Sequence, residues 1–271
     1  MLIRGAYFLP AMATLGNALC GFAAMYVVTL DPLQSDAVAR FLADNRFLAA
    51  VYLILGSMVL DALDGRLARM TRQTSDFGGQ LDSLSDAISF GAAPALIALH
   101  VFKADAGDVP QAVGRLVFAL GLIYVACAVI RLARFNVTNE HDEQHHMSFL
   151  GLPSPAAAAA VLGLVLIQRE LSATPSLYWL WVAATWLVPA VLIAAGLLMV
   201  STVRYPHVVN RLLRGRKSLG TLVATVALLV LLVVEHRYVL GTAGLIVAAS
   251  GPLYQLRARL LRKRARPTLA A

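Results

Sequence analysis

Charged residues are scarce in this sequence: they make up 14% of its 271 residues, against about a quarter in a soluble domain. Hydrophobic residues make up 59%, and the mean hydropathy is +0.72. The apolar residues also fall in runs near the ~20 residues that cross the core of a bilayer. This balance excludes an ordinary soluble domain and indicates a membrane protein.

Cysteine is nearly absent as well. Cys20 and Cys127 both sit inside apolar runs, and neither belongs to a CxxC pair or a metal-ligand spacing. We therefore predict buried, inert thiols. The chain also has no evident repeat at a fixed period and no low-complexity linker that would divide it.

Eight apolar segments predict an all-α, polytopic membrane helix bundle with about eight transmembrane helices. The run that follows Arg4 shows no clear cleavage site, so we interpret it as an uncleaved first span rather than a signal peptide. Residues 1–215 form the expected six-span core, and residues 216–271 supply two further spans and a basic tail. The predicted spans are 8–30, 47–66, 82–102, 112–133, 153–168, 178–201, 218–234 and 238–255.

The distribution of Lys and Arg predicts the orientation of these spans. If both termini are cytoplasmic, 17 of the 23 basic residues lie inside and six outside, as the positive-inside rule requires. The net charge of +8 is thereby explained by residues beside membrane spans, and we expect no nucleic-acid partner. The basic tail, 257–266, is interpreted as an anchor at an anionic leaflet, with specific lipid or partner binding as the alternative.

A polar segment at 137–148 contains three histidines. His141 and His145 have the i,i+4 spacing of a helical metal site, but the segment has weak helix signals and no capping pattern. We favour a solvated loop.

Acidic residues are concentrated at 61–86, between two apolar spans, where five of the fifteen in the chain occur. Charges at membrane depth are costly and usually mark function. Asp61 and Asp64 are three residues apart and Asp82 and Asp86 four apart, so each pair shares one face of a helix. Two helices joined by a turn at 70–79 would point the four carboxylates at one another.

Four such anions require cations, because burial and mutual repulsion would otherwise be severe. One alternative is neutralisation by Arg66, Arg69 and Arg72, although Arg66 and Arg69 lie on different faces from the aspartates. The other is a divalent metal, since an all-oxygen cluster is the ligand set that Mg2+ or Mn2+ prefers, with Ca2+ possible. We favour the metal.

Small residues adjoin the carboxylates: Gly65, Ala68 and Gly78. They would let a polar ligand approach the backbone, and Arg69 is suited to a phosphate oxygen. A divalent ion, an arginine and an accessible backbone together suggest a diphosphate ligand. Close packing of helices is the alternative explanation of the small residues.

The pattern Asp61-x2-Asp64-Gly65-x2-Ala68-Arg69-x8-Gly78-x3-Asp82-x3-Asp86 resembles the signature of the CDP-alcohol phosphatidyltransferase family at every fixed position. The resemblance implies that Asp61, Asp64 and Asp82 hold metal, and that Asp86 touches the metal and is the base for the acceptor hydroxyl. It also implies a homodimer and a site for a CDP-activated lipid. The residues expected to bind that lipid are Asn17, Gly65, Ala68, Arg69, Ser75 and Gly78.

Five further segments resemble the serine-using members of that family in bacteria and archaea, the phosphatidylserine synthases: 14–22, 82–94, 131–136, 151–155 and 201–206. This resemblance implies CDP-diacylglycerol and L-serine as substrates, a bacterial inner membrane and an active site at its cytoplasmic face. A zwitterionic acceptor needs cationic donors for its carboxylate. The residues expected to bind the acceptor or the lipid phosphate are Arg131, Arg134, Asn136 and Arg204, although positive-inside anchoring also accounts for arginines at span ends.

Two other functions stay open at this point. Within the family, the acceptor could be glycerol 3-phosphate or inositol phosphate, which should need a denser basic pocket. Outside it, intramembrane carboxylates also serve cation transporters. A transporter would more naturally show paired broken spans in two related halves, and no such halves are visible.

Overall fold

The computed structural model describes residues 8–31, 37–71, 76–141, 151–203, 205 and 235–265. Ser75, Arg204 and the predicted span at 218–234 lie outside the described residues, as do the side chains of Ala68 and Arg69. So do His145, His146 and the end of the basic tail.

Helices account for nearly all of the described chain, which contains no strand, so the predicted all-α class is confirmed. Besides the long helices there are a short helix before the second span, a π-helical turn and a 3-10 turn. In chain order the elements are α2 (Phe8–Val28), α3 (Ala37–Asp44), α4 (Arg46–Thr71), α5 (Asp76–Asp86), the π-helical turn Ala87–Ala92, α6 (Ala93–Asp105), α7 (Gln111–His141), α8 (Ser154–Ser172), the 3-10 turn Pro175–Leu177, α9 (Tyr178–Val200) and α12 (His236–Ala265).

Seven helical segments within the described residues are long and apolar enough to cross a membrane, which makes the chain an integral membrane protein. They confirm seven of the eight predicted spans, while the sidedness of the termini stays a prediction. The segments are Pro10–Val28, Arg46–Leu67, Phe77–Asp105, Gln111–Val137, Ser154–Ser172, Pro175–Val200 and His236–Arg257.

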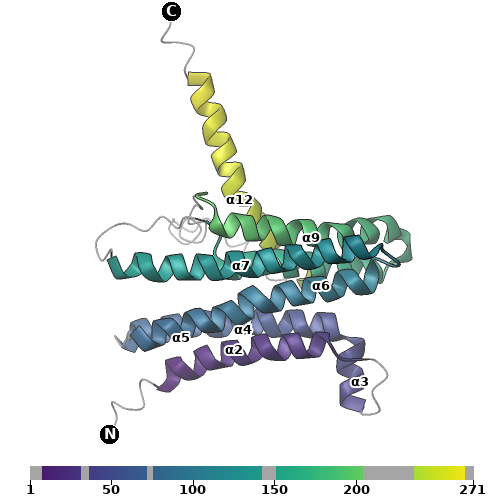
Figure 1. Cartoon of the computed structure of the whole chain (residues 1–271), viewed down its shortest axis with the longest axis horizontal. Helices are drawn as coiled ribbons and strands as arrows, with labels where there is room; N and C mark the ends of the chain where they lie inside the picture. Colours follow the sequence, from purple (N-terminus) through teal and green to yellow (C-terminus); the bar gives the residue numbers. More distant parts are fainter. Residues whose placement is uncertain are drawn as a thin grey trace, which may run out of the picture.

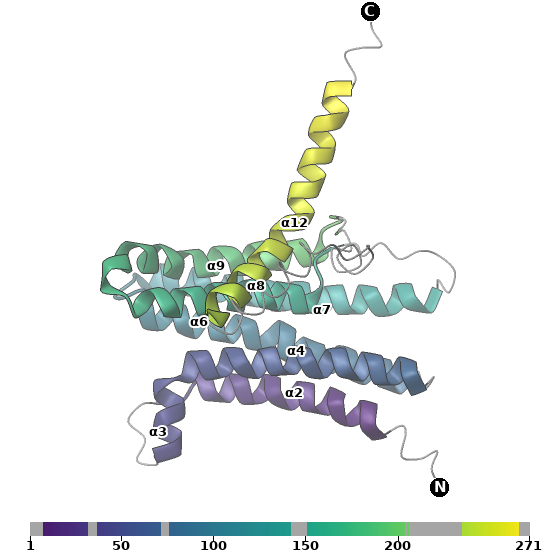
Figure 2. The same ribbon diagram turned by 180° about the vertical axis from the view of Figure 1, so that it is seen from behind.

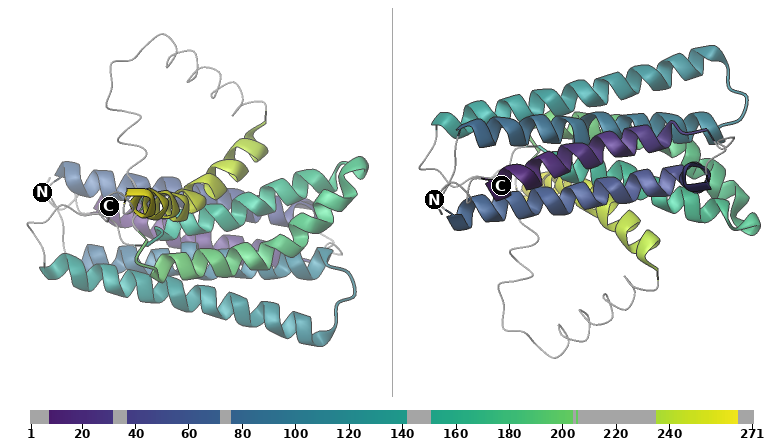
Figure 3. Two further views of the ribbon diagram at one scale, coloured as in Figure 1. Left: turned by 90° about the horizontal axis from the view of Figure 1, so that it is seen from above. Right: turned by 90° about the horizontal axis from the view of Figure 1, so that it is seen from below.

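The long helices run along one common direction, and the C-terminal part of α12 leaves the bundle (Figures 1 and 2). The end of α4, the start of α5 and the end of α7 all lie at one end of the bundle, whereas α3 lies at the other (Figure 1). Seen from below, α2 lies between α4 and the α5–α6 segment (Figure 3, right), and it packs against all three helices. The acidic segment is therefore gathered at one end, beside α2.

The turn between the two acidic helices is shorter than expected. The predicted turn covered 70–79, but α4 continues to Thr71 and α5 begins at Asp76. The third span is correspondingly longer than predicted, and Gly78 lies inside α5. The helix α7 also extends to His141, so the first part of the 137–148 segment is helical rather than a loop.

A π-helical turn begins directly after Asp86. Its wider spacing is visible in the bond from the Ala93 N–H to the Ile88 carbonyl, five residues back. The buried Tyr124 on α7 donates its hydroxyl hydrogen to the Phe90 carbonyl in this turn, at 2.9 Å. Such π-turns are rare and frequently mark functional sites, and this one sets the direction in which α6 leaves Asp86.

Close contact between α2 and the π-turn depends on Gly21. A Cβ at this position would overlap the Ser89 hydroxyl and lie 2.8 Å from the Ser89 Cα. We expect Gly21→Ala to destabilise the protein by about 1–3 kcal/mol, because backbone must move to relieve the overlap. The measurement is thermal unfolding of the detergent-solubilised protein.

Gly56→Ala is the matched control for this variant. Gly56 is exposed on α4, and a Cβ there would have no atom within 4 Å. It should leave the unfolding temperature unchanged or raise it, since alanine favours a helix by about 1 kcal/mol over glycine. Equal effects of the two substitutions would show that the α2 contact is looser than the structure indicates.

The helix α12 packs against α8 through small residues. Gly241 faces Gly163, and Gly244 faces the Ala159 backbone, so close that a Cβ on either α12 glycine would overlap the neighbouring helix. Near the site end, the Tyr205 hydroxyl donates to the Ala248 carbonyl at 3.1 Å. Burial raises the pKa of Tyr205 to about 12, so this hydroxyl keeps its proton at neutral pH. α12 thereby holds the segment that follows α9.

Candidate active site

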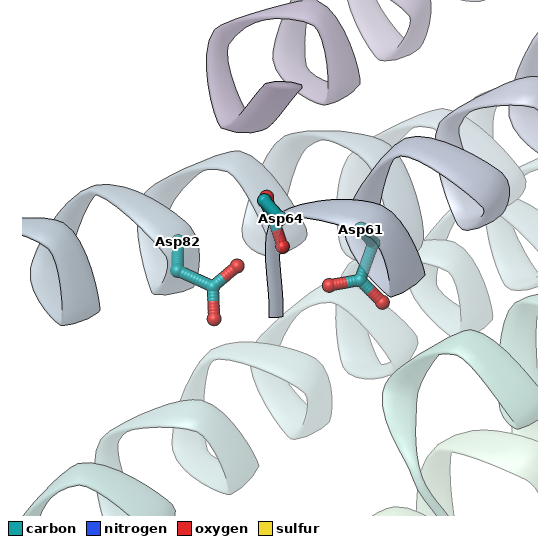
Figure 4. A group of neighbouring side chains, drawn as sticks. All are labelled: Asp61, Asp64 and Asp82. Carbon is teal, nitrogen blue, oxygen red and sulfur yellow. The ribbon is translucent and has the colours of Figure 1, made fainter. Parts of the chain in front are cut away.

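Three carboxylates from two helices meet at the end of the bundle. Asp61 and Asp64 project from α4 and Asp82 from α5, and one carboxylate oxygen from each lies within 4.8 Å of the others (Figure 4). Asp64 is 6% exposed and the other two are half-buried. The three aspartates are called the carboxylate trio below. The sequence predicted that four carboxylates from two helices would meet, and the structure brings three of them together in this group.

No protein cation neutralises the trio among the described side chains. The two ion pairs found there, Arg169 with Asp105 and Arg237 with Glu170, lie elsewhere. Arg66 is exposed and forms no ion pair in this part of the chain. Arg69 and Arg72 have side chains outside the described set, so their predicted alternative role stays open.

Two oxygens of the trio are buried and unpaired. Asp64 Oδ2 and Asp82 Oδ1 have no hydrogen-bond partner among the described residues. Leaving buried carboxylate oxygens in this state is unfavourable. The residues present therefore fit a hard divalent cation, which prefers all-oxygen ligands.

Asp86 has different surroundings from the trio. It lies one turn after Asp82, is 8% exposed, and accepts a hydrogen bond from Asn17 Nδ2 at 3.2 Å. The charge of Arg131 on α7 acts on this carboxylate, although the two form no ion pair in the described part of the chain. The prediction that Asp86 ligates metal stays a prediction, because its oxygens are not among those of the trio.

The helix α2 supplies the neutral polar groups of the site. Thr14 and Asn17 lie three residues apart on one face, and both are buried. The Thr14 hydroxyl donates to the Pro10 carbonyl at 3.0 Å, and Asn17 donates to Asp86. The Ser89 hydroxyl donates to the Asn17 main-chain carbonyl at 2.8 Å. Thr14 was not predicted as a site residue, although its position three residues before Asn17 puts it on the same face of the helix.

The arginines expected to bind the acceptor separate into two environments. Arg131 contacts the hydroxyl of the fully buried Ser154, and its Nε is buried without a hydrogen-bond partner among the described residues. Arg134 donates to the Val200 carbonyl at the end of α9, at 3.4 Å. Of these two arginines, Arg131 is the one whose charge acts on Asp86. Ser154, which lies in the segment 151–155 noted in the sequence but was not predicted as a site residue, fixes that arginine.

Asn136 joins two helices of the site. Its Oδ1 accepts a hydrogen bond from the Ser83 hydroxyl at 3.0 Å, which ties α7 to α5 beside Asp82. Its predicted contact with the acceptor stays a prediction.

Gly65 opens a space beside the second carboxylate. A Cβ at this position would have no atom within 4 Å, so close packing of helices does not account for the glycine. Gly65 is partly exposed, and its contact with a ligand stays a prediction. Gly78 lies in the second helix of the site, near its start.

The comparisons with known proteins agree with the family resemblance of the sequence. A family model described as CDP-alcohol phosphatidyltransferase matches residues 7–189. Three relatives named CDP-diacylglycerol–serine O-phosphatidyltransferase illustrate the similarity. The Helicobacter pylori protein is 37% identical over 62% of this chain and 64% of its own length. The Mycobacterium leprae protein is 33% identical over 60% of this chain and 51% of its own. The Bacillus subtilis protein is 29% identical over 74% and 90%. The chain thus spans less than two thirds of the length of the first two.

Proposed function

This chain belongs to the CDP-alcohol phosphatidyltransferase family, and we propose that it transfers the phosphatidyl group of CDP-diacylglycerol to the hydroxyl of L-serine, releasing CMP. One observation carries the proposal: three carboxylates with no cationic partner among the described side chains lie one helical turn from a fourth, which has a partner of its own. The names of the relatives support serine as the acceptor.

The carboxylate trio is the proposed site of Mg2+ or Mn2+, with Ca2+ as an alternative, in a family that generally depends on divalent metal. Asp61, Asp64 and Asp82 would hold the ion through the oxygens that lie within 4.8 Å of one another. When bound, the ion neutralises the diphosphate and makes CMP a better leaving group.

Asp86 is the proposed base. Its carboxylate takes the proton of the serine hydroxyl as the serine oxygen forms a bond to the lipid-bearing phosphorus. The bond from that phosphorus to the CMP oxygen breaks, and CMP leaves with the electron pair. Asn17 holds the carboxylate in place through its hydrogen bond, and this positioning contributes to the step.

For several residues, contact with a substrate is a proposal. The small-residue surface at Gly65, with Ala68, Gly78, Arg69 and Ser75, is proposed to bind the CDP part of the lipid. The proposed contacts of the acceptor or the lipid phosphate are Arg131, Arg134, Asn136 and Arg204. A homodimer in a bacterial inner membrane, with the site at the cytoplasmic face, also stays a proposal.

A panel of acceptors tests the function. Purified protein is incubated with CDP-diacylglycerol and Mn2+ or Mg2+, and CMP release is measured with L-serine, glycerol 3-phosphate or inositol phosphate in turn. We expect CMP release to depend on L-serine and the lipid product to be phosphatidylserine. Release that depends on a phosphorylated alcohol instead would overturn the assignment of serine. Cation flux into liposomes without any CMP release would overturn the transferase itself.

A further inference from the structure

Only one of the two polar atoms of the Asn17 side-chain amide has a hydrogen-bond partner among the described residues. Its Nδ2 donates to Asp86, and its Oδ1 is buried with no hydrogen-bond partner, in a residue that is 0% exposed. Other buried amides of the bundle are better satisfied; the Gln168 Nε2 alone lies within hydrogen-bond distance of both Asp105 and Thr185. An acceptor left unpaired at this depth is costly, so the oxygen points to a donor from outside the chain.

The orientation of the Asn17 amide is fixed by chemistry. Asp86 must be ionised to act as the base, and an ionised carboxylate only accepts hydrogen bonds, so the amide presents its NH2 group to it. The reversed orientation would put two oxygens in contact at 3.2 Å. The Ser89 hydroxyl donates its hydrogen to the Asn17 main-chain carbonyl and so is not a donor to the side-chain oxygen. The amide oxygen is therefore held as an acceptor beside the proposed base.

A second unpaired group is a donor on Arg131, whose charge acts on Asp86. Arg131 Nε is buried without a hydrogen-bond partner among the described residues, and the Arg131 guanidinium is anchored by Ser154. An unpaired neutral acceptor therefore belongs to the residue that bonds Asp86, and an unpaired cationic donor belongs to the arginine whose charge acts on it. An amino acid offers the complementary pair: an ammonium that donates and a carboxylate that accepts.

We propose that Asn17 Oδ1 accepts a hydrogen bond from the protonated amine of the acceptor, so that Asn17 selects an alcohol with an amine on the adjacent carbon. The same amide then fixes Asp86 with one end and the substrate with the other, which places the hydroxyl beside the base. This inference rests on the proposed function. It moves Asn17 from the contacts of the CDP-lipid, where the sequence placed it, to those of the acceptor.

The test compares two acceptors that differ in the amine alone, L-serine and 3-hydroxypropionate, in the wild-type protein and in Asn17→Ala. The measured quantity is the ratio of their kcat/KM values. We expect this ratio to fall about 10- to 100-fold in the variant, the range of a hydrogen bond to a charged group. If turnover of 3-hydroxypropionate is too slow, its inhibition constant against L-serine replaces kcat/KM. Asn17→Ser serves as the second variant if the alanine variant does not fold.

The outcomes separate the possible roles of Asn17. If it only positions Asp86, both acceptors lose activity by the same factor and the ratio stays unchanged, which overturns the inference. A raised KM for CDP-diacylglycerol with an unchanged ratio also overturns it and returns Asn17 to the lipid. Thr185→Ala, which removes a buried hydroxyl away from the site, should leave the ratio unchanged. Absence of serine-dependent CMP release in the wild-type protein would instead refute the proposed function.

Discussion

Asp86→Asn is expected to lower serine-dependent CMP release by at least about 100-fold, the contribution of a general base, while CDP-diacylglycerol binding is largely retained. The asparagine keeps the size of the side chain but cannot take the proton of the hydroxyl. The carboxylate trio, whose oxygens lie within 4.8 Å of one another, is left intact. The measurements are steady-state CMP release and equilibrium binding of the CDP-lipid.

Asp61→Asn is the comparison for this variant, because it removes an oxygen of the trio itself. It should weaken CDP-lipid binding as well as turnover. Equal losses of lipid binding in Asp86→Asn and Asp61→Asn would mean that Asp86 is only a metal ligand. Asp108→Asn, an exposed carboxylate in the turn after α6, controls for the loss of one negative charge and should change neither quantity.

Removal of divalent metal is the second large effect that we expect. Dialysis against a chelator should abolish CMP release, and added Mn2+ or Mg2+ should restore it. The metal can also be followed without turnover: Mn2+ binding to the wild-type protein is measured by titration with electron paramagnetic resonance. Since Asp64 and Asp82 each hold an unpaired buried oxygen, Asp64→Asn and Asp82→Asn should each weaken Mn2+ binding by at least about 10-fold, in the range for disturbing a metal site.

The alternative to a metal at the trio is neutralisation by arginine. In that case Mn2+ would not bind at micromolar to millimolar concentrations, and the aspartate variants would lose stability without any change in metal affinity. Asp108→Asn again serves as the control and should bind Mn2+ as the wild-type protein does.

The spans and the helical placement of the aspartates could be predicted from the sequence for physical reasons. A lipid-exposed backbone must satisfy its own hydrogen bonds, so long apolar runs become helices. Helical spacing then puts Asp61 beside Asp64. The helix boundaries were less predictable: Gly78 looked like a turn residue but lies within α5, because glycine costs a helix only about 1 kcal/mol and packing outweighs it.

The contacts between distant helices could not be predicted from the pattern. The bond from Asn17 to Asp86 joins residues 69 apart in the chain, and no local spacing encodes it. The π-turn after Asp86 likewise depends on Tyr124, whose hydroxyl bonds to Phe90 from another helix. Ser154 has no local feature that marks it as the partner of Arg131. These long-range contacts give the four aspartates their different surroundings.

The most direct measurement of the central claim follows one oxygen atom. L-serine labelled with heavy oxygen in its hydroxyl is supplied with CDP-diacylglycerol and Mn2+, and both products are analysed by mass spectrometry. Attack of the serine oxygen on the lipid-bearing phosphorus predicts label in the phosphate ester of phosphatidylserine and unlabelled CMP. Labelled CMP, or phosphatidylserine without the label, would contradict the account.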